Sequence, residues 1–352
     1  MHCLLRPWPL LPAAILCLLT ACGGGKESPD PGAAAPASPA APAAPGAPAT
    51  TPSERLSIGV IPKGTIHEFW LAVQSGAEAA GRDADVEIRW DGPKTETAHD
   101  EQRRILESMV GAGVDGIVIA PTDQVALRRP VEAAVKAGVP VVVFDSNLEG
   151  DAHLSFVATD NRRGGALAGE ALATRCAATP RRMLLLRYTE GSGSTRLREA
   201  GFEEAAKAGG GTVVESQFTD GTTEGAITTA TNMLQRHVRD GRLEVDGIFA
   251  CNQPTTIGMF RALDRLRKQG IKVDALLIGF DSSDELVKGV EEGTIAGLVV
   301  QDPVRMGNLA VKTMVDHLRG KPVEKSVDTG VTLVTRENLG DPQVARLVGR
   351  GG

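Results

Sequence analysis

The chain has 352 residues, a formal net charge of -6 and five cysteines. This acidic balance gives no reason to expect a nucleic-acid partner, which usually requires a basic face. Hydrophobic residues make up 42% of the sequence, which is enough for a buried core, and the length beyond the N-terminal segments suits two domains of ordinary size. Only Cys176 and Cys251 lie in the part expected to fold, too few for a disulfide framework. We interpret both as buried free thiols, with a bridge between them as the alternative.

Residues 1–21 have the proportions of a secretory signal peptide, with an early arginine and then an apolar run from Leu10 to Leu19. The run is shorter than the roughly 20 apolar residues that span a bilayer. It ends in Leu19, Thr, Ala and Cys22, which resembles a bacterial lipoprotein signal, where small residues before a cysteine direct lipidation of the thiol. The resemblance implies that Cys22 carries a lipid; an ordinary signal peptide is the alternative.

Residues 22–53 continue as a spacer rich in Ala, Pro, Gly, Ser and Thr. Such a segment buries too little apolar surface to offset the entropy of ordering it, and its prolines favour a semi-extended tether. We therefore expect a globular module held near a membrane surface through Cys22. No later stretch is long and apolar enough to predict a membrane-spanning segment.

From residue 56 onward, short apolar segments alternate with helical patterns such as 98–112 and 123–137. The segments are almost continuously apolar, as strands buried on both faces are. This alternation predicts parallel sheets covered by helices, and the number of strands suits two sheets better than one. The predicted strands are 56–62, 86–91, 115–121, 139–145, 154–159, 183–188, 212–218, 246–251, 275–281 and 295–301.

The predicted fold class is therefore α/β, with two Rossmann-like lobes that each hold a parallel sheet. We expect three crossings between the lobes, near Thr159, Asp302 and Thr329, which together would form a hinge. The first lobe is expected to comprise 54–159 and 302–326. The second is expected to comprise 160–301 and 327–345.

Polar side chains follow many of the predicted strands. In parallel α/β sheets, ligands bind outside the carboxyl ends of the strands, so these side chains are candidates for one shared site. Carboxylates, amides and guanidinium groups suit sugar hydroxyls, and an aromatic ring suits the apolar face of a sugar. The alternative for Asp145, Asn252 and Asp281 is a helix cap, and for Arg196 an exposed surface position. The candidates are Lys63, His67, Phe69, Trp70, Asp145, Arg196, Asn252, Asp281 and Gln301.

Seven segments of the chain together carry a resemblance to a known family. They are IGVIPKGTIHEFWLAVQSGAEAA, GIVIAPTD, VPVVVFDS, ATDN, FACN, IGFDSSDE and VVQDPVRMG. In order and spacing, across nearly all of 56–340, they resemble the ribose-binding-protein family of periplasmic sugar-binding proteins. The resemblance implies the type I periplasmic binding protein fold, which is related to the ligand domains of lac-repressor-type regulators.

The resemblance also implies an aromatic clamp at Phe69 and Trp70, beside a polar residue at His67. It implies hydroxyl-binding roles for Asp145, Arg196, Asn252, Asp281 and Gln301. Three positions depart from the family's ribose binders. Ser146 stands where they have an arginine. Phe218 is the only candidate for the aromatic that the family's pattern places near 217–221 in the second lobe. Lys63 is not typical of ribose binders, although the position resembles that of a relative that binds a furanose-like quorum signal.

The function implied is that of an extracytoplasmic solute-binding protein. It would capture a small sugar between two lobes and deliver it to an ABC permease in the inner membrane. The alternative is a sensor that presents a sugar or furanose signal to a membrane receptor. We expect a lipid-anchored monomer on the periplasmic or extracytoplasmic face.

Two other classes of protein are less well supported. No HExxH, GxSxG or Walker A pattern occurs, and the histidines have no metal-ligand spacing. We therefore expect no enzyme activity, no metal and no cofactor. The leader and spacer occupy the place where a transcription regulator would carry its DNA-binding helices. Since Asp145 and Asp281 balance Lys63 and Arg196, we expect a neutral polyhydroxylated ring as the ligand, rather than a sugar acid or phosphate.

Overall fold

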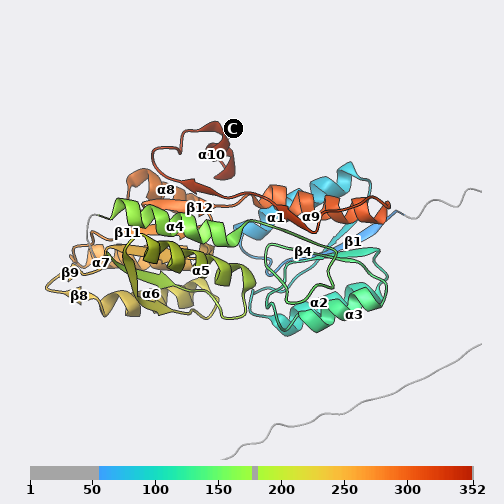
Figure 1. The fold of residues 1–352 in the computed structure, drawn as a ribbon, viewed down its shortest axis with the longest axis horizontal. Coiled ribbons are helices and arrows are strands. Elements are labelled where there is room, and N and C mark those ends of the chain that lie inside the picture. Colours follow the sequence, from blue (N-terminus) through green and yellow to red (C-terminus); the bar gives the residue numbers. More distant parts are fainter. Residues whose placement is uncertain (1–54, 177–180, 351–352) are drawn as a thin grey trace, which may run out of the picture. The chain divides into compact units, whose positions relative to one another are not determined.

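The computed structural model describes residues 55–176 and 181–350. The predicted signal peptide, Cys22 and the tether lie outside the described residues. All ten predicted strands are present within them, in two six-stranded sheets that belong to two lobes (Figure 1).

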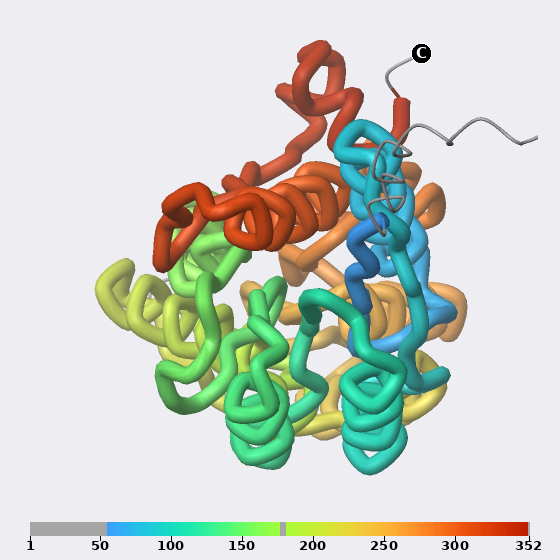
Figure 2. Tube along the Cα trace, turned by 90° about the vertical axis from the view of Figure 1, so that its right-hand side faces the viewer, coloured from blue at the N-terminus to red at the C-terminus, as the bar shows by residue number. Residues whose placement is uncertain are grey.

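The sheet of the first lobe is entirely parallel. Its apolar side chains alternate between two helix-covered faces. Helices α1 and α9 pack on one face and α2 and α3 on the other, above and below the sheet in Figure 2. In spatial order the strands are β13 (Ser326–Asp328), β5 (Ser155–Ala158), β4 (Val141–Phe144), β3 (Gly116–Ile119), β1 (Ser57–Ile61) and β2 (Glu87–Trp90). The helices are α1 (Glu68–Asp83), α2 (His99–Gly111), α3 (Arg128–Lys136) and α9 (Pro303–Leu318).

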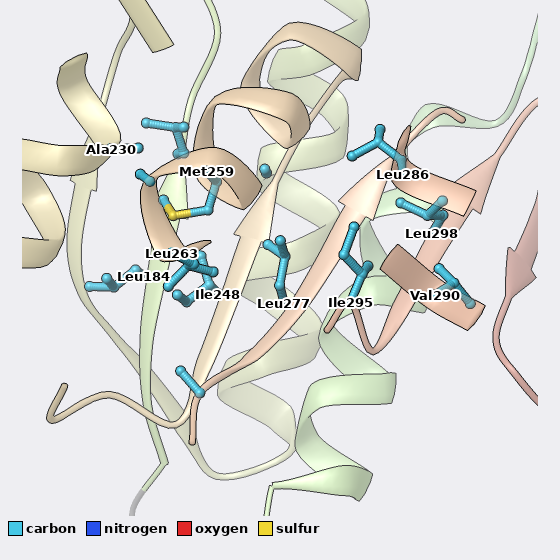
Figure 3. Close-up of a cluster of buried hydrophobic side chains, with 14 of the residues drawn as sticks. Leu184, Ala230, Ile248, Met259, Leu263, Leu277, Leu286, Val290, Ile295 and Leu298 are labelled. Carbon is cyan, nitrogen blue, oxygen red and sulfur yellow. The ribbon is translucent and has the colours of Figure 1, made fainter. Parts of the chain in front are cut away.

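The sheet of the second lobe has the same plan, except that its edge strand β14 is antiparallel to β12. Helices α4 and α5 cover one face, while α6, α7, α8 and α10 cover the other, where the apolar cluster of Figure 3 lies. In spatial order the strands are β14 (Thr332–Val334), β12 (Gly297–Val300), β11 (Leu276–Phe280), β10 (Gly247–Ala250), β6 (Arg181–Leu186) and β7 (Gly211–Gln217). The remaining elements are α4 (Asn161–Arg175), α5 (Gly193–Ala208), α6 (Thr223–Gln235), α7 (Gln253–Lys268), α8 (Asp284–Glu292), α10 (Pro342–Leu347) and the pair β8 (Val238–Arg239) and β9 (Arg242–Leu243).

One helix begins later than the periodicity predicts. The apolar repeat suggests a start at residue 123, but α3 begins at Arg128. The Asp123 carboxylate accepts hydrogen bonds from the N–H groups of Val125 and Ala126, both at 2.8 Å. These bonds cap a single turn, which does not continue directly as α-helix, because the Arg128 N–H donates to the Val125 carbonyl at 3.2 Å while the Gln124 carbonyl accepts from the Glu149 N–H at 2.9 Å. The end is as expected, because Gly138 adopts a φ of 90° just past the helix.

The chain passes between the two sheets three times: after β5, after β12 and after β13. The first and third crossings are hydrogen-bonded to each other, with the Thr159 and Thr329 hydroxyls 3.2 Å apart. The expected lobe boundary between 326 and 327 is wrong by a few residues, since it falls inside β13, which pairs with β5 in the first sheet. The crossing follows that strand instead.

Cys176 and Cys251 are both free and buried. Burial raises the pKa of each thiol above its ordinary value, which makes them unreactive as nucleophiles. No helix in the described ranges is long and apolar enough to cross a membrane.

Candidate ligand-binding site

One polar cavity lies between the lobes, at the carboxyl ends of strands from both sheets. Eight of the nine predicted side chains line it, and only Arg196 does not. From the first lobe it is lined by Lys63, His67, Phe69, Trp70, Glu96 and Asp145. From the second lobe it is lined by Ser194, Thr195, Arg198, Asn252, Gln253, Pro254, Asp281 and Gln301.

Asp145 and Asp281 occupy equivalent places in the two lobes. Asp145 follows β4 and Asp281 follows β11, with left-handed φ values of 58° and 67°. Their N–H groups donate to the carbonyls of Val157 and Val299 on the adjacent strands, at 3.0 and 2.8 Å. Aspartate tolerates this conformation better than most residues, and such local strain is common at ligand sites. The backbone thereby holds both carboxylates at the cavity wall.

Lys63 is buried at the side of the cavity formed by the first lobe. Its ammonium lies 3.4 Å from the Asp145 carboxylate and donates to the hydroxyls of Ser192 and Ser194 at 3.3 and 3.2 Å. Burial raises the pKa of Asp145, while Lys63 and then Arg198 act in the opposite direction. The site therefore holds a buried, paired carboxylate that remains within reach of a ligand.

Asp281 and Gln301 form the corresponding group in the second lobe. The Gln301 amide donates to the Asp281 carboxylate at 2.8 Å, and burial raises the pKa of Asp281, opposed by Arg198 and Gln301. The Gln301 Oε1 atom is buried without a hydrogen-bond partner among the described residues. A buried acceptor without a partner is costly, so this oxygen is suited to a hydroxyl donor in the cavity.

The arginine of the site is Arg198, not Arg196. Both lie on α5, but two helical positions turn a side chain through roughly 200°, so Arg196 is exposed while Arg198 is 2% exposed. The Arg198 guanidinium donates to Asn161 Oδ1 at 2.7 Å and to the Cys251 carbonyl at 3.1 Å. It also lies 3.7 Å from the centre of the Phe280 ring. The structure buries 194, 198 and 202, spaced four apart, so the spacing of Arg198 from the apolar Phe202 is the signal that the sequence offers.

Asn252 has the role of a helix cap and also lines the cavity. Its Oδ1 accepts a hydrogen bond from the Thr255 N–H at 3.2 Å, in a capping box that begins α7. The cap uses Oδ1 and leaves Nδ2 out, and Asn252 also lines the cavity. Capping and ligand binding are therefore compatible for Asn252. The helix after Asp281 is capped by Ser283, so Asp281 is not its cap.

The two adjacent aromatics differ in their surroundings. Trp70 is 2% exposed and packs edge-on against Phe69 and Phe144, with ring centres 4.9 and 6.2 Å apart. Most of its surface therefore belongs to the core, while Phe69 is only half-buried. The Trp70 indole donates to Glu96 at 2.9 Å, a cavity residue that sequence reasoning missed.

Two further expectations concern the second-lobe aromatic and metals. Phe218 does not line the cavity; the Arg187 guanidinium lies 5.4 Å from its ring centre. In the searched ranges, 55–176 and 181–350, no group of three or more His, Cys, Asp or Glu is placed to hold a metal ion.

Two mainly parallel sheets, three crossings and a polar cavity at the strand ends define the type I periplasmic binding protein fold. Residues 58–322 match the family model described as a periplasmic binding protein domain. The chain belongs to this family. Membership confirms the predicted fold class and the extracytoplasmic location, and it identifies the chain as a solute-binding protein and not an enzyme.

Several characterised relatives share most of the chain. The D-ribose/D-allose-binding protein of Pseudomonas aeruginosa is 30% identical over 299 residues, which cover 82% of this chain and 91% of the relative. A carbohydrate transporter solute-binding protein from Agrobacterium radiobacter, solved with D-arabinose, is 33% identical with a TM-score of 0.78, covering 84% of this chain and 99% of that one. An ABC transporter solute-binding protein from Agrobacterium vitis with bound D-fucose is 35% identical with a TM-score of 0.77, covering 83% and 99%. These relatives confirm the resemblance to the sugar-binding branch of the family.

Proposed function

We propose that this protein captures a small sugar between its two lobes and delivers it to an ABC importer. The observation that carries the proposal is the cavity itself, in which carboxylates, amides and a guanidinium group from both lobes face one space. Each sugar hydroxyl both donates and accepts, so it can satisfy the unpartnered Gln301 oxygen and the Asp145 and Asp281 carboxylates. Relatives that bind D-ribose, D-allose, D-arabinose and D-fucose support a sugar of this size.

The charges in the cavity favour a neutral ring over a sugar acid or a phosphate. Arg198 takes the place that Arg196 was expected to fill, and Glu96 adds a third carboxylate. An anionic ligand would therefore meet three carboxylates and two cations in a site that excludes most water, where an unpaired charge is costly. A neutral sugar instead donates hydrogen bonds from its hydroxyls to these carboxylates.

The test begins with a thermal-shift screen of pentoses, hexoses, 6-deoxyhexoses and inositols. A ligand that binds only the folded state adds about 4 kcal/mol of stability at a thousandfold excess over Kd. Calorimetry with a matched pair, D-galactose and D-galacturonic acid, then tests the ligand class. We expect the neutral member to bind at least as tightly as the acid. Tighter binding of the acid, lost in Lys63→Met, would show that the class is wrong.

Delivery to an importer is tested in cells. Uptake of the labelled sugar should fall in a strain without this gene and recover when the gene is returned. Unchanged uptake, together with loss of a transcriptional response to the sugar, would favour a sensor that acts through a membrane receptor.

The membrane attachment rests on Cys22. The small residues before it and the Pro-rich tether after it support a lipid anchor at this position, and we expect the anchored protein to be a monomer. Labelled palmitate should enter the wild-type protein and not Cys22→Ala. Equal labelling of the two proteins would contradict a lipid at this position.

A further inference from the structure

Asn161 stands at the first crossing between the lobes, although it does not line the cavity. It is the first residue of α4 and only 2% exposed. Its Oδ1 accepts a hydrogen bond from Arg198 Nε at 2.7 Å, and its Nδ2 donates to the backbone carbonyl of Asp145 at 3.3 Å. The guanidinium only donates and the carbonyl only accepts, so the chemistry fixes which end of the amide faces which partner.

The two partners of Asn161 belong to different lobes, and both line the cavity. Arg198 is on α5 of the second lobe, and Asp145 ends β4 of the first. One buried amide thus links a ligand-facing residue of each lobe, directly beside a segment that must bend if the lobes move. Rotation of the lobes about this crossing would change the distance from the Asp145 carbonyl to the amide.

Helix capping does not account for this arrangement. The N-cap of α4 is Asp160, whose carboxylate accepts from the Arg163 N–H at 2.9 Å. The helix start is therefore satisfied without the side chain of Asn161. What that side chain adds is the orientation of Arg198, whose Nε it occupies while Nη1 donates to the Cys251 carbonyl at 3.1 Å. Arg198 itself lines the cavity.

We propose that Asn161 is a positioning residue that couples closure of the lobes to the orientation of the sugar-binding arginine. In the closed arrangement the Asn161 amide bridges Asp145 and Arg198. The Arg198 side chain is therefore held in its ligand-binding orientation only when the first lobe contacts Asn161 through the Asp145 carbonyl. The inference rests on the proposed function and adds a residue outside the cavity to it.

Two substitutions separate the halves of the bridge. Asn161→Asp keeps the acceptor for Arg198 but removes the donor to the Asp145 carbonyl, and Asn161→Ala removes both. The matched control is Thr329→Val, which removes a buried hydroxyl at the neighbouring crossing and touches neither Arg198 nor Asp145. Melting temperatures establish that each variant folds.

Sugar binding is measured by calorimetry with D-arabinose and D-fucose as probes. Lobe closure is measured as a distance distribution between spin labels on Lys136→Cys and Arg239→Cys, both exposed and on different lobes, in a Cys22→Ala background.

Asn161→Ala should weaken binding of the probe roughly tenfold, as the loss of a hydrogen bond to a charged group predicts. This effect should be smaller in an Arg198→Lys background, which lacks the Nε donor. Asn161→Asp should shift the labels to longer distances, whereas Thr329→Val should change the melting temperature and leave Kd within about twofold of the wild type.

Two results would overturn the coupling. One is that the effects of Asn161→Ala and Arg198→Lys multiply, because residues that act independently show no interaction energy. The other is that Asn161→Asp leaves both the label distances and Kd unchanged. If the wild type binds neither probe, the proposed function fails for these sugars. The label distances measured without sugar then still test whether Asn161 links the lobes. A longer distance in Asn161→Asp supports that link, and an unchanged distance overturns it.

Discussion

Two arginines on one helix provide a matched pair for testing the cavity. Arg198 is buried at the cavity wall while Arg196 faces solvent, and both belong to α5. Arg198→Ala should weaken sugar binding about ten- to a hundredfold, because hydrogen bonds to charged groups are worth about 1.5–3 kcal/mol. Arg196→Ala should leave the affinity within about twofold of the wild type. Calorimetry with the best sugar from the screen measures both, and equal losses would contradict the assignment.

The sequence predicts the position of a site residue well when that residue directly follows a strand, because the backbone of the sheet then fixes where it lies. Asp145 and Asp281 follow apolar strands directly, so the geometry of a parallel sheet places them at its carboxyl edge. Arg198 depends on the rotation of a helix about its axis, and an error of two positions selects the opposite face. Glu96 lies in the loop between β2 and α2, where no periodicity applies. Its inward position is visible only from its hydrogen bond to Trp70.

At the scale of elements, the contact between α4 and α5 holds Arg198 in place. A Cβ atom on Gly165 of α4 would lie 1.8 Å from the Arg198 carbonyl, and one on Gly201 of α5 would lie 2.0 Å from the Arg162 carbonyl. Both would press on backbone, which cannot rotate away. The two helices are therefore as close as they are because glycine stands at both contacts.

Gly165→Ala should consequently destabilise the protein by about 1–3 kcal/mol through overpacking, and should weaken sugar binding by displacing Arg198. Gly111→Ala is the control, because a Cβ there meets nothing within 4 Å. Since alanine is a better helix former than glycine, Gly111→Ala at the end of α2 should leave the stability of the protein unchanged or raise it by up to about 1 kcal/mol. Urea unfolding measures both variants. Equal stability of the two would contradict the close contact.

The elements that the sequence predicts best are the strands in the interiors of the two sheets. All ten predicted strands are present, and most of them are short apolar runs between two helix-covered faces. The strands that the sequence did not predict, β8, β9, β13 and β14, have two or three residues each, with at most one of them buried. Their pairing depends on the sheets that they join and not on their own composition. The helix α10 is likewise short, and only Val344 within it is buried.

For the whole molecule, the three crossings and the shared cavity imply a closing motion. The chain positions of the crossings follow from where apolar strands end and polar segments begin, which is why the sequence places them near Thr159, Asp302 and Thr329. The final boundary is less well placed because β13 is too short to identify from composition. The strands with which a short edge strand pairs decide which lobe it joins, and only the structure shows that pairing.

A sugar that contacts both lobes binds the closed arrangement better than any open one, and it shifts the population by that difference in affinity. We therefore expect the radius of gyration from small-angle scattering to fall when the sugar is added at saturation, confirmed by calorimetry on the same sample. Arg198→Ala, at a sugar concentration raised to saturate it, should show a smaller fall, because the second lobe then has fewer contacts that favour closure. An unchanged radius in the saturated wild-type protein would contradict closure and would mean that the sugar enters a cleft that is already formed.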